Sequence, residues 1–482
     1  MKKRIISLVL LGSMLASLAA CGGEEDKSNN NDNTQGSSEA YDATGIEKTD
    51  YDLPFKILAP EWGMYERYFF ADDPGTDVMK KALYERELAV EEHLGIDMSY
   101  VIKGTIENIP TEMQQMVMTG DDTYQLVLTH CIRGLSQMVV EDLLYDFNDF
   151  EYVDMTKEWW NEAGNAALEV GGHRYLTVSD YMLADPNAIL VNLDILDEYN
   201  LEDPYQLVRD GNWTIDKMME MMSAVTTDNG DGKWDHNDVY GLTTADDWFT
   251  NSFIFSSGVN LVSRNTDGEF VFAFDSERAY TMVEKLDQLL MGSDTYVYPI
   301  QLGKSGEEHM ADDTYVDLSK GRSLFNIASV QQLYLYRDVD INFGILPYPK
   351  LDETQDGYTT NDWSGLMCVP KTVGNADMVG KAIELLAYFS EDVRYSYYEI
   401  MLGEKLTRDP ESKEMLDIIF DGIVFDPGVA YFGLNDSMRK FFYLGENVIF
   451  PGKGSKRFAS HIATSKPAVE ATIEEFNLEI AE

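Results

Sequence analysis

Apolar and polar positions follow two different periods along residues 55–146. Short apolar runs typical of buried strands are separated by longer runs in which apolar residues recur every three or four positions, as on one face of a helix. In chain order these runs are FKILAP, DVMKKALYERELAVEEHLG, IDMSYVI, IENIPTEMQQMVMTG, YQLVLTH and RGLSQMVVEDLLYDF. The alternation predicts an α/β fold with an open, mostly parallel sheet flanked by helices. Ligands of such sheets bind beyond the carboxyl ends of the strands.

A second mixed region begins near residue 173. Its runs are HRYLTVSDYMLADPNAILVNLDILDEYNL, GNWTIDKMMEMMSAVT and VYGLTTADDWF. Thr214 stands where a helix N-cap is expected, before a helix whose methionines share one face and are assigned to the core. Trp159 and Trp160 lie in TKEWWNEA, another helix-like stretch, and are assigned to packing.

The first residues have the pattern of a secretory signal peptide. Basic residues precede an apolar stretch from Ile5 to Leu18. The stretch LAAC resembles a bacterial lipobox, so residues 1–20 are expected to be removed and Cys21 to carry lipid; an ordinary signal peptide with a chance cysteine is the alternative. Residues 21–49 contain almost no apolar side chains, which predicts a disordered linker. No later run could span a bilayer, so we expect the chain at the extracellular face of the cell membrane, anchored by lipid alone.

Composition limits the possible partners. The chain has 482 residues, too many for one hydrophobic core, so two or more lobes are expected. Its formal net charge of -48 would repel nucleic acid and anionic lipid headgroups. With Cys21 assigned to lipid, only Cys131 and Cys368 remain. Two buried free thiols are favoured over a single bridge between them, and a monomer is expected.

The acidic run TDNGDGKWDHND at residues 227–238 resembles the calcium loop of EF-hand and dockerin-like proteins. Gly232 falls at loop position 6, where the sharp turn requires glycine. The match is incomplete, because a threonine stands at position 1 and the nearest acid is displaced by one place. The predicted ligands are Thr227, Asn229, Asp231, Lys233 (through its carbonyl), Asp235 and Asp238. One weakly held structural calcium ion and an empty acidic turn remain equal alternatives.

Several segments together resemble family 1 extracellular solute-binding proteins. They are YLTVSDYMLADPNAILVNLDILDEYNL, NWTIDKMMEMM, LSKGRSLFNIASVQQLYLYRDVDINFGILPYPK and SGLMCVPKTVGNADMVGKAIELLAYFS, in the family's order. The resemblance implies two α/β lobes joined by a hinge, with residues 50–187 and 330–392 in the first lobe and 188–329 and 393–482 in the second. It also implies a ligand in the cleft between the lobes, closure around that ligand, and delivery to an ABC permease in the membrane.

A sugar-binding site requires flat aromatic surfaces beside acid, amide or imidazole groups, because a sugar has apolar ring faces and a girdle of hydroxyls. Such side chains stand where cleft loops are expected. Packing is the alternative to ligand contact at each position. The two interpretations are about equally supported at His130, Gln331, Trp363 and Tyr431. The candidates are Trp62, Tyr65, His130, Asp180, Tyr181, Trp248, Gln331, Trp363 and Tyr431.

The site chemistry favours a binding protein over an enzyme. The sequence contains no nucleophile elbow, no H-E-x-x-H, no phosphate-binding glycine loop and no C-x-x-C, and acidic residues are too abundant for a carboxylate pair to be informative. A surface carbohydrate-active enzyme and an adhesion or scaffold lipoprotein remain the alternatives. Aromatic loops without clustered arginine or lysine favour a neutral carbohydrate, an oligosaccharide in particular, while a peptide or another polar solute stays open.

Overall fold

The computed structural model describes residues 43–130, 135–245, 249–298, 315–336, 338–402, 410–433, 436–452 and 454–481. The chain divides into two units, residues 1–45 and the body formed by residues 46–482. The predicted signal peptide, Cys21 and most of the predicted linker lie outside the described residues. Within the described part of the chain, no helix has the length and apolar character needed to cross a membrane.

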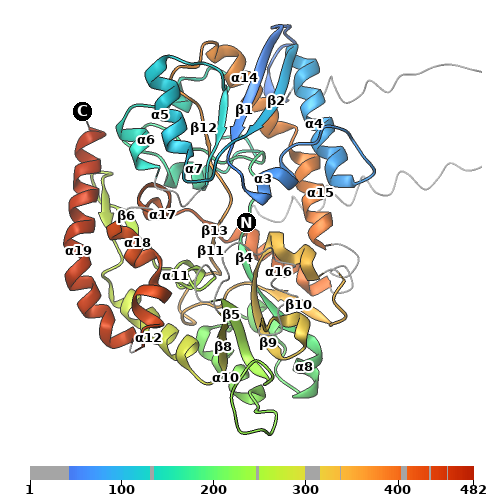
Figure 1. Cartoon of the computed structure of the whole chain (residues 1–482), viewed down its shortest axis with the longest axis vertical. Helices are drawn as coiled ribbons and strands as arrows, with labels where there is room; N and C mark the ends of the chain where they lie inside the picture. The colour runs from blue at the N-terminus through green and yellow to red at the C-terminus, as the bar shows by residue number, and fades with distance from the viewer. Residues whose placement is uncertain are drawn as a thin grey trace, which may run out of the picture. The chain divides into compact units, whose positions relative to one another are not determined.

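The described part of the body contains two larger sheets, visible in the upper and lower parts of Figure 1. The first has the strand order β12-β3-β1-β2. Its strands are β1 (Leu53–Ala59), β2 (Ile96–Ile102), β3 (Leu126–Leu128) and β12 (Met367–Cys368). β1 pairs in parallel with β2 and β3, and β12 joins β3 antiparallel. The predicted alternation of strands and helices in this region is confirmed.

Helix α4 (Val78–Leu94), which follows β1, shows how local sequence sets these elements. The Asp77 side chain accepts a hydrogen bond from the backbone N–H of Lys80, which supplies the N-cap. The helix ends at Gly95, whose φ of 59° is the left-handed conformation that glycine tolerates best. Both signals are contained in the sequence of the helix itself.

The second sheet has the order β10-β4-β9-β5-β8. Its strands are β4 (Asn187–Asn192), β5 (Tyr240–Ala245), β8 (Thr295–Tyr298), β9 (Ser323–Ser329) and β10 (Phe343–Leu346). β5 is parallel to β8 and β9, but β4 is antiparallel to both β9 and β10. Helix α10 (Ile215–Val225) covers this sheet. Thr214 is its N-cap, accepting from the N–H of Lys217 at 3.3 Å, and its methionine face is buried, as predicted.

The remaining elements connect or cover the sheets. Small pairs are formed by β6 (Val262–Arg264) with β7 (Phe270–Phe272) and by β11 (Thr360–Asn361) with β13 (Ile423–Val424). The other helices are α3 (Gly63–Tyr68), α5 (Ile109–Thr119), α6 (Ser136–Val140), α7 (Glu162–Ala167), α8 (Leu193–Glu198), α9 (Pro204–Arg209), α11 (Ser252–Ser256), α12 (Glu277–Met291), α14 (Ala376–Tyr388), α15 (Glu391–Leu402), α16 (Pro410–Asp421), α17 (Pro427–Phe432), α18 (Asp436–Phe442), α19 (Gly454–Glu479), the 3-10 turns η2 (Phe147–Asp149), η3 (Leu318–Lys320) and η4 (Val330–Tyr336), and the π-helical η6 (Gly445–Ile449).

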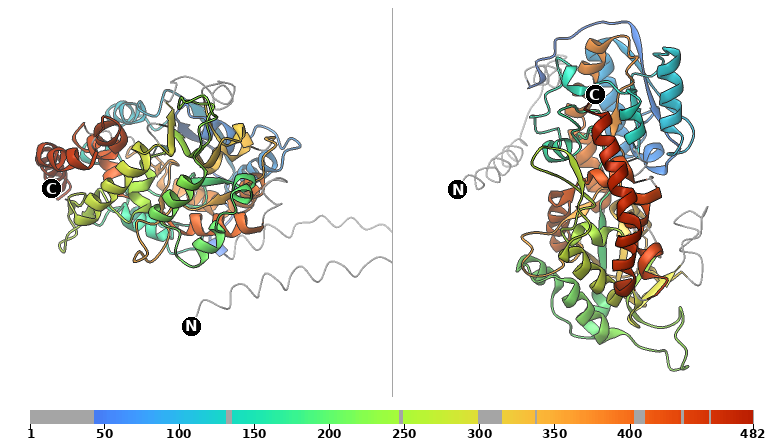
Figure 2. Two further views of the ribbon diagram at one scale, coloured as in Figure 1. Left: turned by 90° about the horizontal axis from the view of Figure 1, so that it is seen from below. Right: turned by 90° about the vertical axis from the view of Figure 1, so that its left-hand side faces the viewer.

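Strand pairing and helix contacts bear on the lobe boundaries expected at residues 330 and 393, which stay predictions. β10 pairs with β4, so the chain stays with the second sheet until about residue 346 and joins the first sheet only at β12. Helix α15 packs against α4 of the first half, although most of it was assigned to the second lobe. The C-terminal helix α19 contacts α12 and also α6, and Figure 2 shows it running along the side of the body. Which half of the body a segment belongs to depends on long-range strand pairing. An apolar run such as FGIL does not specify its partner strand.

The tryptophan pair in TKEWWNEA is buried, as predicted. Trp159 and Trp160 are 7% and 5% exposed, and both indole N–H groups donate to Glu384 of α14, at 2.8 and 2.9 Å. Burial raises the pKa of Glu384, and the indole donors partly offset that shift. Cys368 is a buried free cysteine and burial raises the pKa of its thiol; Cys131 lies outside the described residues.

Candidate functional site

Three chain segments cross between the two halves and are hydrogen-bonded to one another through two buried carboxyl groups. The segments are residues 184–187, 329–331 and 361–364. Asp362 Oδ1 accepts from the backbone N–H of Asp185 at 2.7 Å, and Asp185 Oδ1 accepts from the backbone N–H of Gln331 at 2.9 Å. Pro186 and Asp362 also form an antiparallel bridge. The three crossings therefore form one connected unit.

Both carboxyl groups lie in the interior, each 5% exposed. Burial raises the pKa of Asp185 to about 7, partly offset by the Gln331 N–H, and the Asp362 charge raises it further. Burial also raises the pKa of Asp362, which accepts bonds from Ser364. Burial and the proximity of a second acid therefore both disfavour ionising the two carboxyl groups together.

An aromatic cluster lies at the carboxyl ends of β1 and β3. Trp62 precedes α3, and its ring centroid is 4.6 Å from the ring of His130 and 5.3 Å from that of Tyr65. Trp62 keeps partial exposure, while His130 is 5% exposed. Trp62 and Tyr65 follow the first strand of the sequence and His130 follows the third, and the parallel pairing of β1 with β3 brings them together. Trp62 is the member with surface left for a ligand.

Tyr65 is the fully buried member of this cluster. Its hydroxyl donates to the carbonyl of Thr129. A Cβ on Gly365 would lie 1.7 Å from the Tyr65 hydroxyl and 2.0 Å from the Thr129 oxygen, so only glycine fits there. The backbone just after the third crossing, at Gly365, therefore lies directly against the Tyr65 side chain of the aromatic cluster. Tyr65, predicted as a ligand contact, packs in the core in this conformation because its hydroxyl is satisfied internally.

Asp180 and Tyr181, which were both predicted to contact the ligand, lie in different environments. Asp180 forms an ion pair with Arg394 of α15 at 2.9 Å; burial raises the pKa of Asp180 to about 6 despite this arginine. Tyr181 is fully buried, with its hydroxyl 2.9 Å from that of Tyr100 and its ring 4.6 Å from the Arg86 guanidinium. Asp180 therefore remains available near the first crossing, whereas Tyr181 packs beneath it.

The late candidates also differ in position. Gln331 is half-buried at the second crossing, and Trp363 lies at the third, 7% exposed, with its backbone N–H donating to the Asp185 carbonyl at 3.2 Å. Tyr431 lies away from the crossings, in a core where its ring is 5.6 Å from that of Phe476 and its hydroxyl donates to Leu168. Trp248 lies outside the described residues. The structure thus gathers Trp62, His130, Gln331 and Trp363 near the crossings, but not Tyr431.

One set of polar residues at the crossings was not predicted from the sequence. Asn187 Nδ2 donates to the Ser252 hydroxyl at 2.8 Å, and that hydroxyl donates to Asn361 Oδ1, also at 2.8 Å. All three side chains are at least 96% buried. An asparagine at the start of an apolar strand is the available sequence signal, and by itself it resembles an ordinary strand end.

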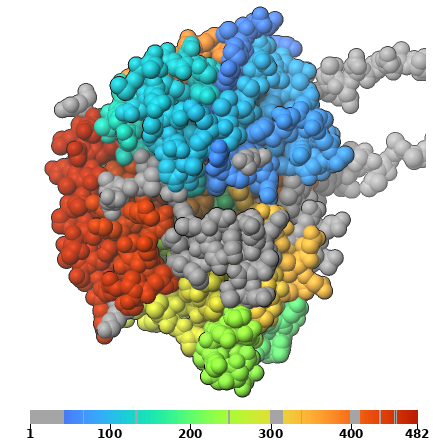
Figure 3. All heavy atoms as spheres, in the orientation of Figure 1, coloured from blue at the N-terminus to red at the C-terminus, as the bar shows by residue number. Residues whose placement is uncertain are grey.

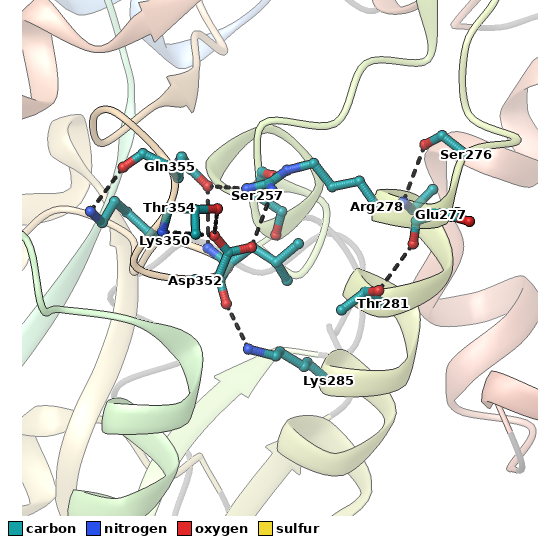
Figure 4. A network of polar contacts seen from close by, with 12 residues as sticks. Ser257, Ser276, Glu277, Arg278, Thr281, Lys285, Lys350, Asp352, Thr354 and Gln355 are labelled. Atoms are coloured by element: carbon teal, nitrogen blue, oxygen red, sulfur yellow. Dashed lines mark hydrogen bonds and ion pairs between the residues drawn. The ribbon is translucent and has the colours of Figure 1, made fainter.

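The segment carrying Ser252 is fixed at its other end by the network in Figure 4. Arg278 of α12 donates to the Ser257 carbonyl at 2.5 Å, to Asp352 at 3.1 Å and to Gln355 at 2.8 Å. Gln355 in turn donates to the Ser256 carbonyl at 2.8 Å. These bonds hold the end of α11 against α12 and the loop after β10, so α11 presents Ser252 from a rigid frame.

The acidic loop lies apart from the crossings, between α10 and β5. Asp238 is fully buried and its two carboxylate oxygens accept from the N–H groups of Asn229 and Asp235, at 2.9 and 2.6 Å. Thr227 pairs by its backbone with Val239 and donates its hydroxyl to a carbonyl. Among the described residues, no group of three or more His, Cys, Asp or Glu could hold a metal ion. The loop is braced from within, and calcium binding stays a prediction.

In the orientation of Figure 3, the blue and cyan atoms of the first half lie above the yellow and green atoms of the second half. Comparison with solved structures finds the same architecture. The ABC substrate-binding protein Lmo0181 from Listeria monocytogenes, solved with cycloalternan, aligns over 89% of this chain and 98% of its own, at 13% identity and a TM-score of 0.53. The fold is that of ABC-transporter solute-binding proteins.

Two further structures share this fold. The GacH receptor of Streptomyces glaucescens, solved unliganded and with acarbose, aligns over 87% of this chain and 98% of its own at 12% identity, with a TM-score of 0.57. UgpB from Mycobacterium tuberculosis, solved with glycerophosphocholine, covers 87% and 99% at 13% identity, with a TM-score of 0.59. The sequence matches no protein-family model and no curated protein. At these identities the shared property is the two-lobed α/β fold, which confirms the predicted fold class.

Proposed function

We propose that this protein is the solute-binding component of an ABC transporter, captures a neutral carbohydrate between its lobes and delivers it to a membrane permease. The observation that carries the proposal is the convergence of the partly exposed Trp62 with three hydrogen-bonded crossings in a solute-binding fold. Trp62 provides a flat surface for a sugar ring, and the polar groups at the crossings provide hydrogen bonds for its hydroxyls.

A neutral ligand is favoured by the charges at the crossings. The two buried ionisable groups that join the three segments, Asp185 and Asp362, are both acids. An anionic ligand placed beside them would raise the cost of ionising either group further. Cycloalternan and acarbose in two of the structural relatives fit this ligand class, whereas the glycerophosphocholine of UgpB marks the competing class of charged solutes.

Capture requires no chemistry on the ligand. A ligand that contacts both halves only when they approach shifts the population toward the closed form, by as much as its affinity for the two forms differs. The permease then recognises the closed form. Lipid on Cys21 would hold the protein at the extracellular face of the membrane, and residues 21–49 would act as its linker.

The experiment is a binding screen with purified mature protein. Neutral tri- and tetrasaccharides of glucose, xylose and galactose are titrated by calorimetry, with glycerophosphocholine as the charged comparison. Trp62→Ala should weaken the best ligand at least tenfold, the loss expected for one sugar–aromatic contact of about 1.4 kcal/mol. Trp234→Ala is the matched control, because Trp234 is 52% exposed on the distant acidic loop.

The outcomes separate the competing functions. Saturable binding with the sugar recovered unchanged supports a receptor, and cleavage of the sugar would identify an enzyme. If only glycerophosphocholine binds, the ligand is a charged solute and not a neutral carbohydrate. If no solute binds, a scaffold function remains as the explanation. Equal loss of affinity in both tryptophan variants would exclude Trp62 as the contact.

A further inference from the structure

Three buried asparagines lie on two of the crossings and at the start of α11. Asn187 begins β4, Asn251 precedes α11, and Asn361 belongs to β11. Their exposed fractions are 1%, 1% and 4%. Ser252 joins two of them, since its hydroxyl accepts from Asn187 Nδ2 and donates to Asn361 Oδ1, each at 2.8 Å. Asn251 is its neighbour in the chain and the N-cap residue of α11. Asn187, Ser252, Asn361 and the adjacent Asn251 are called the asparagine cluster below.

The cluster leaves several of its polar atoms without a hydrogen bond. These are Asn187 Oδ1, Asn361 Nδ2, and both Oδ1 and Nδ2 of Asn251. Buried side-chain amides in folded proteins are nearly always paired, because an unpaired donor or acceptor loses its water without replacement. Asn165 shows the usual arrangement in the same chain: it is 1% exposed, its Nδ2 donates to the Val178 carbonyl at 2.9 Å, and its Oδ1 accepts from the Val178 N–H at 2.7 Å.

We propose that Asn187, Asn251 and Asn361 form a subsite that binds the hydroxyl groups of a neutral sugar ring at the end of the ligand. This inference rests on the proposed function. The unpaired set contains two acceptors and two donors, and a hydroxyl group both donates and accepts, so adjacent sugar hydroxyls match it better than an ion would. A carboxylate or phosphate would satisfy only the donors and would lie near Asp362, the neighbour of Asn361.

The three asparagines come from different segments, which gives the subsite a second property. Asn187 belongs to the first crossing, Asn361 begins the third, and Asn251 follows β5 of the second half. A ring hydrogen-bonded to all three would add to the bonds that already join the first and third crossings through Ser252, Asp185 and Asp362. Ligand binding at this point is therefore expected to stabilise the relative position of the crossings, as a closing receptor requires.

The test uses a substitution for which a ligand contact and a structural role predict opposite results. Asn251→Leu keeps the branching and the number of side-chain heavy atoms and removes both unpaired polar atoms, so the ligand-free protein should melt at the same temperature as the wild type or higher. The affinity for the best neutral oligosaccharide should fall at least tenfold, the effect of losing two modest hydrogen bonds. Asn251→Ala, which leaves room for the ligand, should show the same loss of affinity if the leucine variant folds poorly.

Asn165→Leu is the matched control, because its amide is buried and fully paired. It should lower the melting temperature and leave the affinity within about twofold of the wild type. If the Asn251 variants keep wild-type affinity, or if they melt as early as Asn165→Leu, the asparagine has a structural role and the subsite is refuted. If the wild type binds none of the neutral oligosaccharides, the proposed function fails first, and the subsite fails with it.

Discussion

The buried carboxyl group of Asp185 should make the stability of this protein fall as the pH rises. Its folded-state pKa is raised to about 7 from an unfolded value of 3.8, chiefly by burial. Between these two values the folded protein binds more protons than the unfolded chain. The free energy of unfolding therefore decreases through this window, and the loss is complete above pH 7.

Asp185→Asn isolates this effect. Asparagine keeps the size of the side chain and an Oδ1 that can accept from the Gln331 N–H, but it cannot ionise. A shift of roughly 3 units corresponds to at most about 4 kcal/mol at pH 8 and about 1.5 kcal/mol at pH 5. Unfolding a body of about 440 residues carries an entropy near 0.9 kcal/mol/K, so the variant should melt about 4 °C higher at pH 8 and about 1.5 °C higher at pH 5.

The assay is thermal unfolding followed by circular dichroism at pH 5 and pH 8, at constant ionic strength. Asp97→Asn is the control, because it removes one charge from an exposed position and should change stability by less than about 0.5 kcal/mol at both values of pH. An equal gain for Asp185→Asn at both values, or a loss at pH 8, would refute the reasoning. In the second case the ionised carboxylate would be stabilising the crossings through its hydrogen bonds.

Three further predictions concern other parts of the body. Gly365→Ala should displace the Tyr65 hydroxyl from Thr129, cost about 2–4 kcal/mol and weaken ligand binding, measured by urea unfolding and calorimetry; unchanged values would show that the backbone can yield there. Glu384→Ala should lower stability by about 3–5 kcal/mol, because two buried indole N–H groups lose their acceptor, and a loss below 1 kcal/mol would contradict this. If residues 227–238 bind calcium with a Kd of about 10⁻⁴ to 10⁻³ M, 10 mM calcium should raise the melting temperature by about 1.5–3 °C over chelator at matched ionic strength, and identical melts would exclude the ion.

Much of the local structure could be predicted because its causes are local. The end of α4 at Gly95 and the N-cap at Thr214 depend on residues within one helical turn. The alternation of apolar runs indicated the α/β class. The burial of Trp159 and Trp160 was expected as well, although they lie in a turn and a bridge before α7 and not on the predicted helix. For the helix ends and the fold class the signal is written in neighbouring positions, and the periods of helices and strands translate it directly.

The site depended on contacts between distant residues. Asp185 and Asp362 are 177 positions apart, and no local pattern pairs them or indicates that both are buried. The same applies to Tyr65 and Tyr431, predicted at the site, whose hydroxyls are satisfied by carbonyls 64 and 263 positions away. Aromatic residues after strands serve packing and binding equally well. Only the tertiary structure separates the two uses, because exposure is set by what the rest of the chain places on top.

The sequence by itself therefore determined the class of fold, the main helices and their ends, and a set of aromatic residues from which a site could be built. Only the tertiary structure showed which of these aromatic residues lie near the crossings. It also showed that β10 pairs within the second sheet, and it revealed the asparagine cluster. The physical reason is that capping and periodicity act over a few residues, whereas strand pairing and the burial of polar groups are settled only when segments far apart in the chain meet.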